Sequence, residues 1–338
     1  MGEISPELFV ETTNSHLRTS AIKAAVELDV FTAIGEGAED AAAIGRRTGA
    51  AARGIQALAD FLTVMGFLDK SEGRYKLTPS SAAFLDRRSP AFVGDMHHFL
   101  ASPEMVKLTL DDPAAFVRNG GSAGLANMAP DNPIWVDFAR YMAPFAGRTA
   151  ELVADHFTHR FTKHPPAPVR ILDIAAGHGL FGIALARRSP EAEVTALDAG
   201  NVLAVARENA AAAGLGARFR ALPGSAFDLA FGGPYDIVLM PNFLHHFDEP
   251  TCVGLLGKAR AALAPGGRVA IVEFVPNEDR VSPSRPAMFA YVMLATTQGG
   301  TSYPPSAFKQ MLAEAGYGHP EVVPLPPTPQ TLIVAAPA

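Results

Sequence analysis

The residues best placed to do chemistry lie in one stretch, residues 169–182, with the sequence VRILDIAAGHGLFG. An apolar run there carries Asp173 near its end, which is typical of a buried parallel strand. Small residues follow, among them Ala175, Gly177 and Gly179, and then an apolar helical pattern. A strand, a tight turn and a helix in this order indicate a nucleotide-binding unit, because the backbone comes close to the ligand and free helix N–H groups face it.

A second carboxylate, Asp198, ends the next predicted strand, 19 residues after Gly179. At a spacing of about 20 residues an acid meets ribose hydroxyls. A dinucleotide would bring a pyrophosphate to the helix N-terminus, whereas S-adenosyl-L-methionine (SAM) brings an ammonium and a carboxylate. Asp173 suits that cationic tail, if only through an ordered water. The pattern is not a full GxGxxG, since Ala175 stands at the first glycine position, so a crossover turn without a ligand is the alternative interpretation.

From residue 169 onward, predicted strands and helices alternate. The strands are expected at 169–174, 193–197, 217–222, 235–240, 268–275, 321–323 and 331–335, with a glycine-rich turn at 264–267. Repeated βα units with short loops predict an α/β fold with a Rossmann-like, doubly wound, mostly parallel sheet. Such sheets bind ligands beyond the carboxyl ends of their strands. We therefore expect one rim to collect the polar residues at those ends, which are Asp173, Asp198, Ser225, Asn242, His245 and Glu273.

The first hundred residues predict a separate, mainly helical domain. Helices are expected at 7–34, 39–48 and 51–65, followed by a hairpin at 68–77. This order is typical of a winged helix-turn-helix, which either recognises DNA or serves as a structural, dimerisation module. The second interpretation is favoured, because Arg53 is the only cation of 51–65 and the helix would bury itself rather than meet phosphates.

An aromatic helical pattern follows at 135–145. Trp135, Phe138 and Met142 share a face through their i, i+3 and i+7 spacing. A core stripe is the usual explanation for this pattern, and the lining of a cleft for a flat aromatic substrate is the alternative. The size of such a cleft would also depend on the packing of Phe145, Met288, Phe289 and Met293.

Composition narrows the class of protein. The chain has 338 residues, 48% of them hydrophobic, which predicts two domains with buried cores. A net charge of −6 argues against a nucleic-acid surface, and a single cysteine, Cys252, fits a reducing compartment. We find no signal peptide, no apolar run long enough to span a membrane and no metal-ligand spacing, so we expect a cytoplasmic protein that needs no metal.

With these residues in view, the chain resembles the class I SAM-dependent methyltransferases. More narrowly, it is similar to the small-molecule O-methyltransferases typified by plant caffeic-acid-type enzymes and bacterial antibiotic- and pigment-pathway relatives. The resemblance covers nearly the whole chain and rests on LDIAAGHG at 172–179, Asp198, LHHFD at 244–248 and APGGRVAIVE at 264–273. The last two stretches are fairly specific, whereas the SAM turn is shared by the whole superfamily.

The resemblance implies a domain plan, a cofactor and partners. It implies a winged-helix-like dimerisation domain at 1–100, a helical linker at 101–160 that contributes to the substrate pocket, and a SAM-binding catalytic domain at 161–338. The cofactor would be SAM and its product S-adenosyl-L-homocysteine (SAH). The partners would be a small aromatic acceptor and a second copy of the chain.

It also implies site residues. His245 matches the family's general base, and Glu273 matches the acid that orients it. The residues expected to bind SAM are Asp173, Ala175, Gly177, Gly179, Asp198, Gly224, Ser225, Phe227 and Asn242. The residues expected to line the acceptor pocket are Trp135, Phe138, Met142, His246 and Met293.

Three positions depart from the family pattern. Ser225 stands where the adenine stretch has an acid, His246 stands where an aspartate often follows the base, and Ser302 stands where a second acid would orient the histidine. At most one carboxylate therefore supports the base in this alignment. His246 is either a pocket wall or, with the register shifted by one, the base itself.

The resemblance implies transfer of a methyl group to a phenolic or enolic hydroxyl, with imidazole as general base. A phenol has a pKa of about 10, so little phenolate exists at neutral pH. Base assistance typically contributes about 10²–10⁴-fold. The alternatives are C-methylation, a SAM-binding homologue that hydroxylates or decarboxylates, and a winged-helix regulator without catalysis.

Overall fold

The computed structural model describes residues 4–125, 132–163 and 168–338. For residues 159–163 it describes the backbone alone. Contacts divide the chain into two compact units, Met1–Pro103 and Glu104–Ala338. The division into domains at 1–100, 101–160 and 161–338 stays a prediction.

The first unit is mainly helical and carries one small hairpin. Its elements are α1 (Glu7–Thr13), α2 (Ser15–Glu27), α3 (Val30–Gly35), α4 (Ala41–Thr48), α5 (Ala52–Val64), β1 (Leu68–Ser71), β2 (Arg74–Leu77), α6 (Pro79–Phe84), η1 (Gly94–Met96) and α7 (His97–Leu100). One apolar cluster from α2 to β2 forms its core, with Phe31, Ile44, Ile55 and Tyr75 fully buried. The predicted mainly helical fold with a hairpin is confirmed for this part of the chain.

The single helix predicted at 7–34 is wrong, because the chain forms three helices there. Asn14 ends α1, and Asp29 adopts a left-handed conformation with φ of 56° before α3 begins. Aspartate tolerates this conformation better than most residues. The apolar periodicity continues across both breaks, which is why the sequence pattern does not reveal them.

The hairpin turns at Glu72 and Gly73, which both have positive φ angles, 49° and 76°. Two positive φ angles at the centre of a two-residue turn match the twist of the flanking strands. The strands pair antiparallel with Leu68 opposite Leu77. The Tyr75 hydroxyl of β2 donates a 2.7 Å hydrogen bond to Asp60 of α5.

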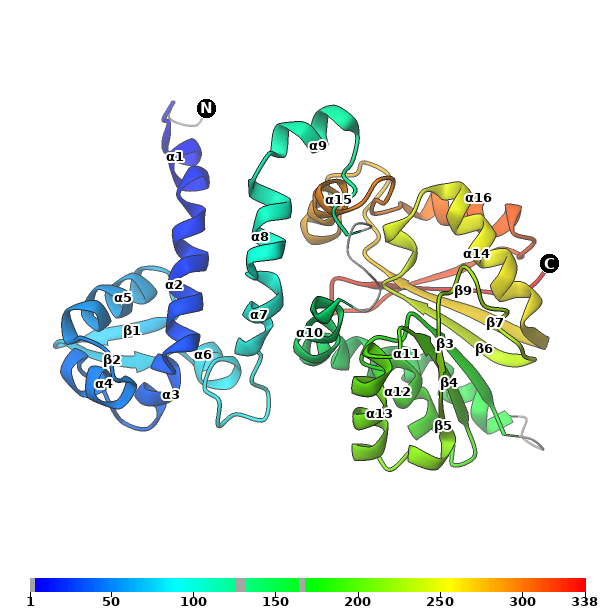
Figure 1. Cartoon of the computed structure of the whole chain (residues 1–338), viewed down its shortest axis with the longest axis horizontal. Coiled ribbons are helices and arrows are strands. Elements are labelled where there is room, and N and C mark those ends of the chain that lie inside the picture. Colours follow the sequence, from blue (N-terminus) through cyan, green and yellow to red (C-terminus); the bar gives the residue numbers. More distant parts are fainter. Residues whose placement is uncertain (1–3, 126–131, 164–167) are drawn as a thin grey trace. The chain divides into compact units, whose positions relative to one another are not determined.

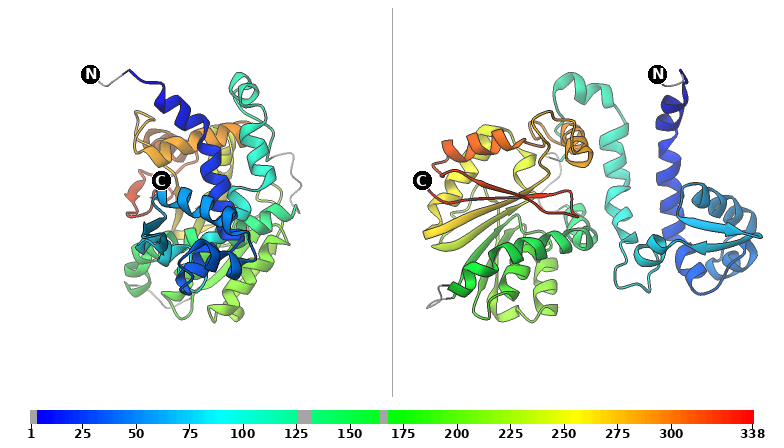
Figure 2. Two further views of the ribbon diagram at one scale, coloured as in Figure 1. Left: turned by 90° about the vertical axis from the view of Figure 1, so that its left-hand side faces the viewer. Right: turned by 180° about the vertical axis from the view of Figure 1, so that it is seen from behind.

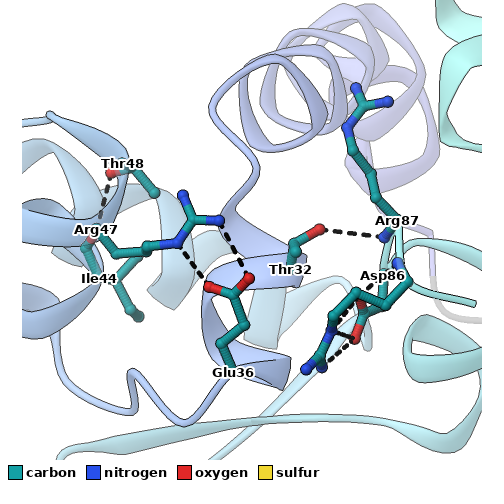
Figure 3. A network of polar contacts seen from close by, with 8 residues as sticks. Thr32, Glu36, Ile44, Arg47, Thr48, Asp86 and Arg87 are labelled. Atoms are coloured by element: carbon teal, nitrogen blue, oxygen red, sulfur yellow. Dashed lines mark hydrogen bonds and ion pairs between the residues drawn. The ribbon is translucent and has the colours of Figure 1, made fainter.

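Polar contacts tie the helices of this unit together (Figure 3). The Arg47 guanidinium of α4 donates to both carboxylate oxygens of Glu36, at 2.6 and 3.1 Å. The backbone N–H of Arg87 donates to the Thr32 hydroxyl of α3 at 3.1 Å. These bonds connect α3 to α4 and to the segment that follows α6.

The second unit is a sheet with helices on both faces (Figure 1). Its helices are α8 (Pro103–Leu110, whose first residue ends the first unit), α9 (Pro113–Asn119), α10 (Pro133–Tyr141), α11 (Ala143–Lys163), α12 (Leu180–Arg187), α13 (Val202–Ala212), η2 (Gly216–Arg218), η3 (Leu244–His246), α14 (Glu249–Ala261), α15 (Ser284–Thr296) and α16 (Pro305–Glu314). Its strands are β3 (Arg170–Ile174), β4 (Glu193–Asp198), β5 (Phe219–Pro223), β6 (Tyr235–Pro241), β7 (Leu263–Glu273), β8 (Glu321–Pro324) and β9 (Thr331–Ala335).

The strand order is β5-β4-β3-β6-β7-β9-β8. Neighbours from β5 to β7 run parallel, whereas β9 runs antiparallel to β7 and β8 antiparallel to β9. The order reverses between β3 and β6, which is the crevice where doubly wound sheets bind ligands. The predicted Rossmann-like, mostly parallel sheet is confirmed.

Two apolar layers cover the faces of the sheet. Alternate strand residues such as Leu172, Val238 and Ile271 pack toward α14 and α16. The residues between them, such as Ile171, Leu239 and Val272, pack toward α11 and α12. The C-terminal strands, drawn in red, and the helices on either side of the sheet are visible in the right-hand view of Figure 2. The buried strands therefore read as continuous apolar runs in the sequence.

The glycine-rich turn predicted at 264–267 lies inside β7 as a bulge. Tyr235 pairs with Leu263, but Ile237 already pairs with Arg268, so extra residues of β7 are accommodated between the two pairs. Gly266 at the bulge has a φ of 78°. Glycine adopts that conformation without strain, which explains how the strand continues through the turn signal.

Candidate active site

The parallel strands bring their carboxyl ends to one edge of the sheet. Asp173 of β3 pairs with Leu239 of β6, and Pro241 of β6 pairs with Val272 of β7. The residues just beyond these pairs therefore share a rim, as the strand pattern predicts.

The turn after β3 has an unusual backbone. Ala175, Gly177 and Gly179 all have positive φ angles, 53°, 56° and 73°. A Cβ atom on Gly177 would meet no protein atom closer than 4.0 Å, whereas one on Gly179 would lie 3.0 Å from Ala206 of α13. Gly179 thus permits close packing of two helices, and Gly177 leaves open space beside the turn.

Asp173 is fully buried beneath this turn. Its Oδ2 accepts a 3.0 Å hydrogen bond from the backbone N–H of Gly182, while its Oδ1 has no partner among the described residues. Burial raises the pKa of Asp173 to about 8, and the Gly182 N–H opposes that rise. A buried carboxylate oxygen without a partner is suited to a cationic ligand group, because it gains a partner when the ligand binds.

Asp198 connects the first two strands of the rim. Its Oδ2 accepts from the N–H of Gly177 at 2.8 Å and its Oδ1 from the N–H of Ala199 at 2.7 Å. Burial raises the pKa of this carboxyl group, and the two N–H donors lower it. Each oxygen keeps further acceptor capacity, which is what ribose hydroxyls require.

The turn after β5 continues the rim beside Asp198. The N–H of Gly224 donates to the Asp198 carbonyl at 2.9 Å, and the Ser225 hydroxyl accepts from the N–H of Phe227 at 3.1 Å. The Phe227 ring is half exposed although it is large and apolar. Lys258 of α14 fixes this turn, because its ammonium donates to the carbonyls of Ala226 and Phe227 at 2.6 and 2.8 Å.

His245 and Glu273 form a buried pair at the ends of β6 and β7. The distance between His245 Nδ1 and Glu273 Oε2 is 2.6 Å, and both residues are buried. The other carboxylate oxygen, Oε1, accepts the backbone N–H groups of Phe243 and His245 at 3.1 and 3.2 Å. Because a carboxylate accepts, Nδ1 carries the proton, and Nε2 is left with a free lone pair.

Aromatic rings surround this pair. The Phe289 ring of α15 lies edge-on to His245 with centroids 4.9 Å apart, and Phe274 packs on Phe289 at 4.3 Å. His246 lies beside His245 with ring centroids 4.3 Å apart and is partly exposed. Burial, together with the neighbouring His245, lowers the pKa of His246 well below its usual range, so this ring is neutral at physiological pH.

A short segment, Gly121–Leu125, fastens the C-terminus of α15. The Ser122 hydroxyl donates to the Ala295 carbonyl at 2.6 Å, and the N–H groups of Ser122 and Leu125 donate to the carbonyls of Thr297 and Thr296. These carbonyls lack partners inside the helix. The segment therefore fixes the helix that carries Phe289 and the buried Met293.

The aromatic helix α10 packs on α13. Trp135 packs with Ala139 against Val202 and Val205 of α13. Phe138 and Met142 are partly buried. The roles of Trp135, Phe138, Met142, His246 and Met293 as acceptor-lining residues stay predictions.

Several residues of the site carry no signal in the sequence. Lys258 and Gln330 contact the rim from elements far away along the chain, and no motif marks them. Ser302, at the position of the missing second acid, is buried, and its hydroxyl has no partner among the described residues. In the same described part of the chain, no group of three or more His, Cys, Asp or Glu residues could hold a metal ion.

Comparison with known proteins identifies this arrangement. The family model of the O-methyltransferase domain matches residues 150–318, and that of the O-methyltransferase dimerisation domain matches residues 10–87. The chain belongs to the O-methyltransferase family. It is a SAM-dependent enzyme, as the resemblance predicts.

Three relatives illustrate the breadth of the family. A solved structure from Nostoc punctiforme PCC 73102, described as a candidate O-methyltransferase, is 43% identical, with a TM-score of 0.93 and coverage of 98% of this chain and 99% of that one. The 3-hydroxy-5-methyl-1-naphthoate 3-O-methyltransferase of Streptomyces sahachiroi is 27% identical over 92% of this chain and 89% of its own length. A PigF structure with SAH is 25% identical, with a TM-score of 0.82 and coverage of 98% and 99%.

The residues of this O-methyltransferase fit SAM. The unpartnered Oδ1 of Asp173 suits the cationic amino-acid end, and the free acceptor capacity of Asp198 suits the ribose hydroxyls. The open space beside Gly177 lets a ligand approach the backbone. None of the helices in the described ranges of this methyltransferase has the length and apolar character to cross a membrane.

Proposed function

We propose that this O-methyltransferase methylates a hydroxyl group of a small aromatic secondary metabolite, with His245 as general base. The observation that carries the proposal is the 2.6 Å contact between His245 Nδ1 and Glu273 Oε2, buried at the rim that holds Asp173 and Asp198. The contact favours His245 over His246 as the base, because within the described ranges the carboxylate contacts His245 and no such ion pair is seen for His246.

Bound SAM supplies an electrophilic methyl carbon on its sulfonium. His245 Nε2 would accept the proton of the acceptor hydroxyl as the bond from the acceptor oxygen to the methyl carbon forms and the carbon–sulfur bond breaks, with SAH as the leaving group. Glu273 holds the ring through Nδ1–H and stabilises the imidazolium that results, as a carboxylate partner does in other histidine bases. Phe289 and Phe274 keep water away from the imidazole and offer flat apolar faces to an aromatic acceptor.

The names of the relatives support the acceptor class. The Streptomyces sahachiroi enzyme is named for a hydroxynaphthoate, and a Streptomyces cremeus relative, 32% identical over 46% of this chain, for an amino-hydroxybenzoate. The groups around His245 agree with an acceptor that is uncharged at its reacting end, since His246 is neutral and Glu273 is paired with His245.

The proposal is tested with His245→Gln. We expect kcat for methyl transfer from methyl-labelled SAM to a panel of phenols to fall about 10²–10⁴-fold, the usual contribution of a general base. The dissociation constant of SAH, measured by calorimetry, should stay within about twofold, because His245 makes no predicted contact with SAM. Retained turnover in this variant would remove His245 from the mechanism. If His246→Gln then lost turnover, the base would be His246.

A non-methylating reaction is the second candidate, and Ser302 is the observation that favours it. Where the family pattern has a second acid, this chain has a buried hydroxyl without a described partner, so only one carboxylate supports the base. A product that lacks the mass of a methyl group would favour this candidate, and a methylated carbon would indicate C-methylation.

We also infer that two copies associate through residues 10–87. The described part of α1 buries none of its side chains, and Leu8 and Phe9 are largely exposed. The helices α2 and α5 form an apolar groove of about 550 Å³, lined by Leu17, Ala21, Ala24, Leu28, Ile55, Leu58 and Phe61 among others. A second copy is the occupant that the dimerisation-domain match favours.

A role as a DNA-binding regulator has less support. Two of the three cations of the hairpin at 68–77 are engaged by acids, because Lys70 pairs with Asp60 and Arg74 pairs with Glu39. Cations that already contact carboxylates are poorly available to phosphates.

A further inference from the structure

Gln330 lies just before β9 and reaches the segment that carries the proposed base. Its side chain is only 2% exposed, and its Nε2 donates a hydrogen bond to Oδ1 of Asn242. Its own backbone is fixed, since the Gln330 carbonyl accepts from the N–H of Leu325 at 3.0 Å. The two amides are 88 residues apart in the sequence.

Asn242 is the residue at which the chain leaves β6 and turns toward His245. Its φ angle is 52°, a left-handed conformation that side chains rarely adopt. Its N–H donates to the Val272 carbonyl at 2.8 Å, which extends the pairing with β7 by one residue. After that turn, the N–H groups of Phe243 and His245 both point at Glu273. The conformation of Asn242 therefore sets the direction of the segment that wraps around Glu273.

The strand register explains how Gln330 reaches this turn. β7 lies between β6 and β9, with Glu273 opposite Thr331. The Gln330 side chain thus extends across the end of β7 and joins the ends of the strands on either side. Its Oε1 is buried without a partner in the described ranges. The side-chain amide of Gln330 is therefore held by its Nε2 bond to Asn242.

We propose that Gln330 is a positioning residue for the general base. It holds Asn242 in its left-handed conformation and so keeps the segment 242–246 in place over Glu273, although it touches no reacting atom. The inference deepens the proposed function and rests on it.

A double-mutant cycle between Gln330 and Asn242 tests the proposal. Gln330→Met keeps the volume and apolar packing of the side chain but removes its hydrogen bond. Asn242→Gly removes the partner amide and still allows a positive φ. We expect each single variant to lose about tenfold in kcat, and the double variant to lose about tenfold rather than a hundredfold, because both remove one interaction.

Two further readouts separate positioning from a general loss of structure. A positioning role lowers kcat and displaces the acidic limb of its pH profile, while the dissociation constant of SAH in Gln330→Met stays within about twofold. The matched control is Gln310→Met on α16, whose exposed amide bonds to Glu314, and it should leave kcat and the pH profile unchanged.

The outcomes are distinguishable from those of the proposed function. Additive losses in the double variant, or a Gln330→Met enzyme with wild-type kcat and pH profile, would overturn the positioning role while leaving the His245 result intact. If instead His245→Gln kept full turnover while the two amides remained coupled, the base assignment would fail and Gln330 would still be the residue that orders this segment.

Discussion

At the scale of single residues, the site depends on which atom carries each proton. Glu273 receives three N–H groups, two from the backbone and one from His245. A carboxylate can accept all three, whereas an amide side chain has only one accepting oxygen. The ionised acid thus selects the His245 tautomer in which Nε2 is free to take a proton.

Glu273→Gln should therefore be nearly as damaging as loss of the base. The amide oxygen would take the two backbone N–H groups, so the NH₂ group would face Nδ1 and force the proton onto Nε2. We expect kcat to fall by about 10³–10⁴-fold, as when the orienting acid of a catalytic histidine becomes an amide. Single-turnover methyl transfer measures the loss, and activity within tenfold of wild type would contradict the tautomer argument.

Asp173 adds a dependence on pH. Its folded pKa is raised to about 8 from an ordinary value of 3.8. The folded state therefore holds a proton that the unfolded chain has lost between these values, so the stability of the ligand-free enzyme falls as pH rises from about 4 to 8. If the carboxylate form meets the cationic end of SAM, affinity for SAM rises by up to about tenfold per pH unit until pH 8 and then levels off.

Thermal unfolding from pH 5 to 8.5 and calorimetric SAM titrations measure these two trends. Asp173→Asn should remove both slopes, whereas Asp69→Asn, an exposed carboxylate on β1, should keep them. A SAM affinity that is independent of pH in the wild-type enzyme would refute the pairing of Asp173 with the cationic group.

At the scale of elements, the proposed base His245 is held by segments packed on each other. The loop after α15 lies directly on the segment that carries His245, because a Cβ atom on Gly300 would collide with the His245 carbonyl and the Thr297 hydroxyl. The same helix is fastened by Ser122 and carries Phe289. A displacement of this loop therefore moves His245 and the Phe289 ring together.

Gly300→Ala should displace His245 and lower kcat by at least tenfold. The collision is with backbone, which cannot rotate away as a flexible side chain could. Gly257→Ala on α14 is the matched control, because a Cβ atom there meets nothing within 4 Å, and it should keep activity and gain up to about 1 kcal/mol of stability. Wild-type kinetics in Gly300→Ala would show that the loop adapts without moving the base.

At the scale of the whole molecule, the first unit has apolar surface that its own fold does not bury. The α2–α5 groove lies within residues 10–87, which match the dimerisation-domain family model, and the exposed Leu8 and Phe9 of α1 come just before that range. Covering such surface is the usual driving force for association.

Leu17→Glu, in the groove, should therefore weaken self-association. Light scattering should give the mass of two 35.6 kDa chains for the wild type and of one chain for the variant at the same micromolar concentration. Val281→Glu, at an exposed position of the second unit, should keep the wild-type mass. A single-chain mass for the wild type would contradict the inferred dimer.

The sequence predicts well those features that depend on neighbouring residues and on strand topology. The order of strands and helices, the glycine turn at Gly177 and Gly179, and the carboxylates Asp173 and Asp198 all follow from local pattern. Parallel strands must end at one edge, so residues at strand ends are brought together whatever the details of packing. By the same reasoning, Glu273 and His245 could be placed at one rim before their contact was known.

Other features depended on packing between distant elements. Hydrophobic periodicity reports that a residue is buried but not which element it packs against. It therefore does not reveal the break at Asp29, the continuation of β7 through its glycines or the packing of Trp135 on α13. Lys258, which contacts the turn at 224–227, and Gln330, which contacts Asn242, are unremarkable in the sequence. Local sequence determined which chemistry this protein carries, and only the tertiary structure decided which distant side chains hold it in place, because such contacts arise when separate strands and helices pack together.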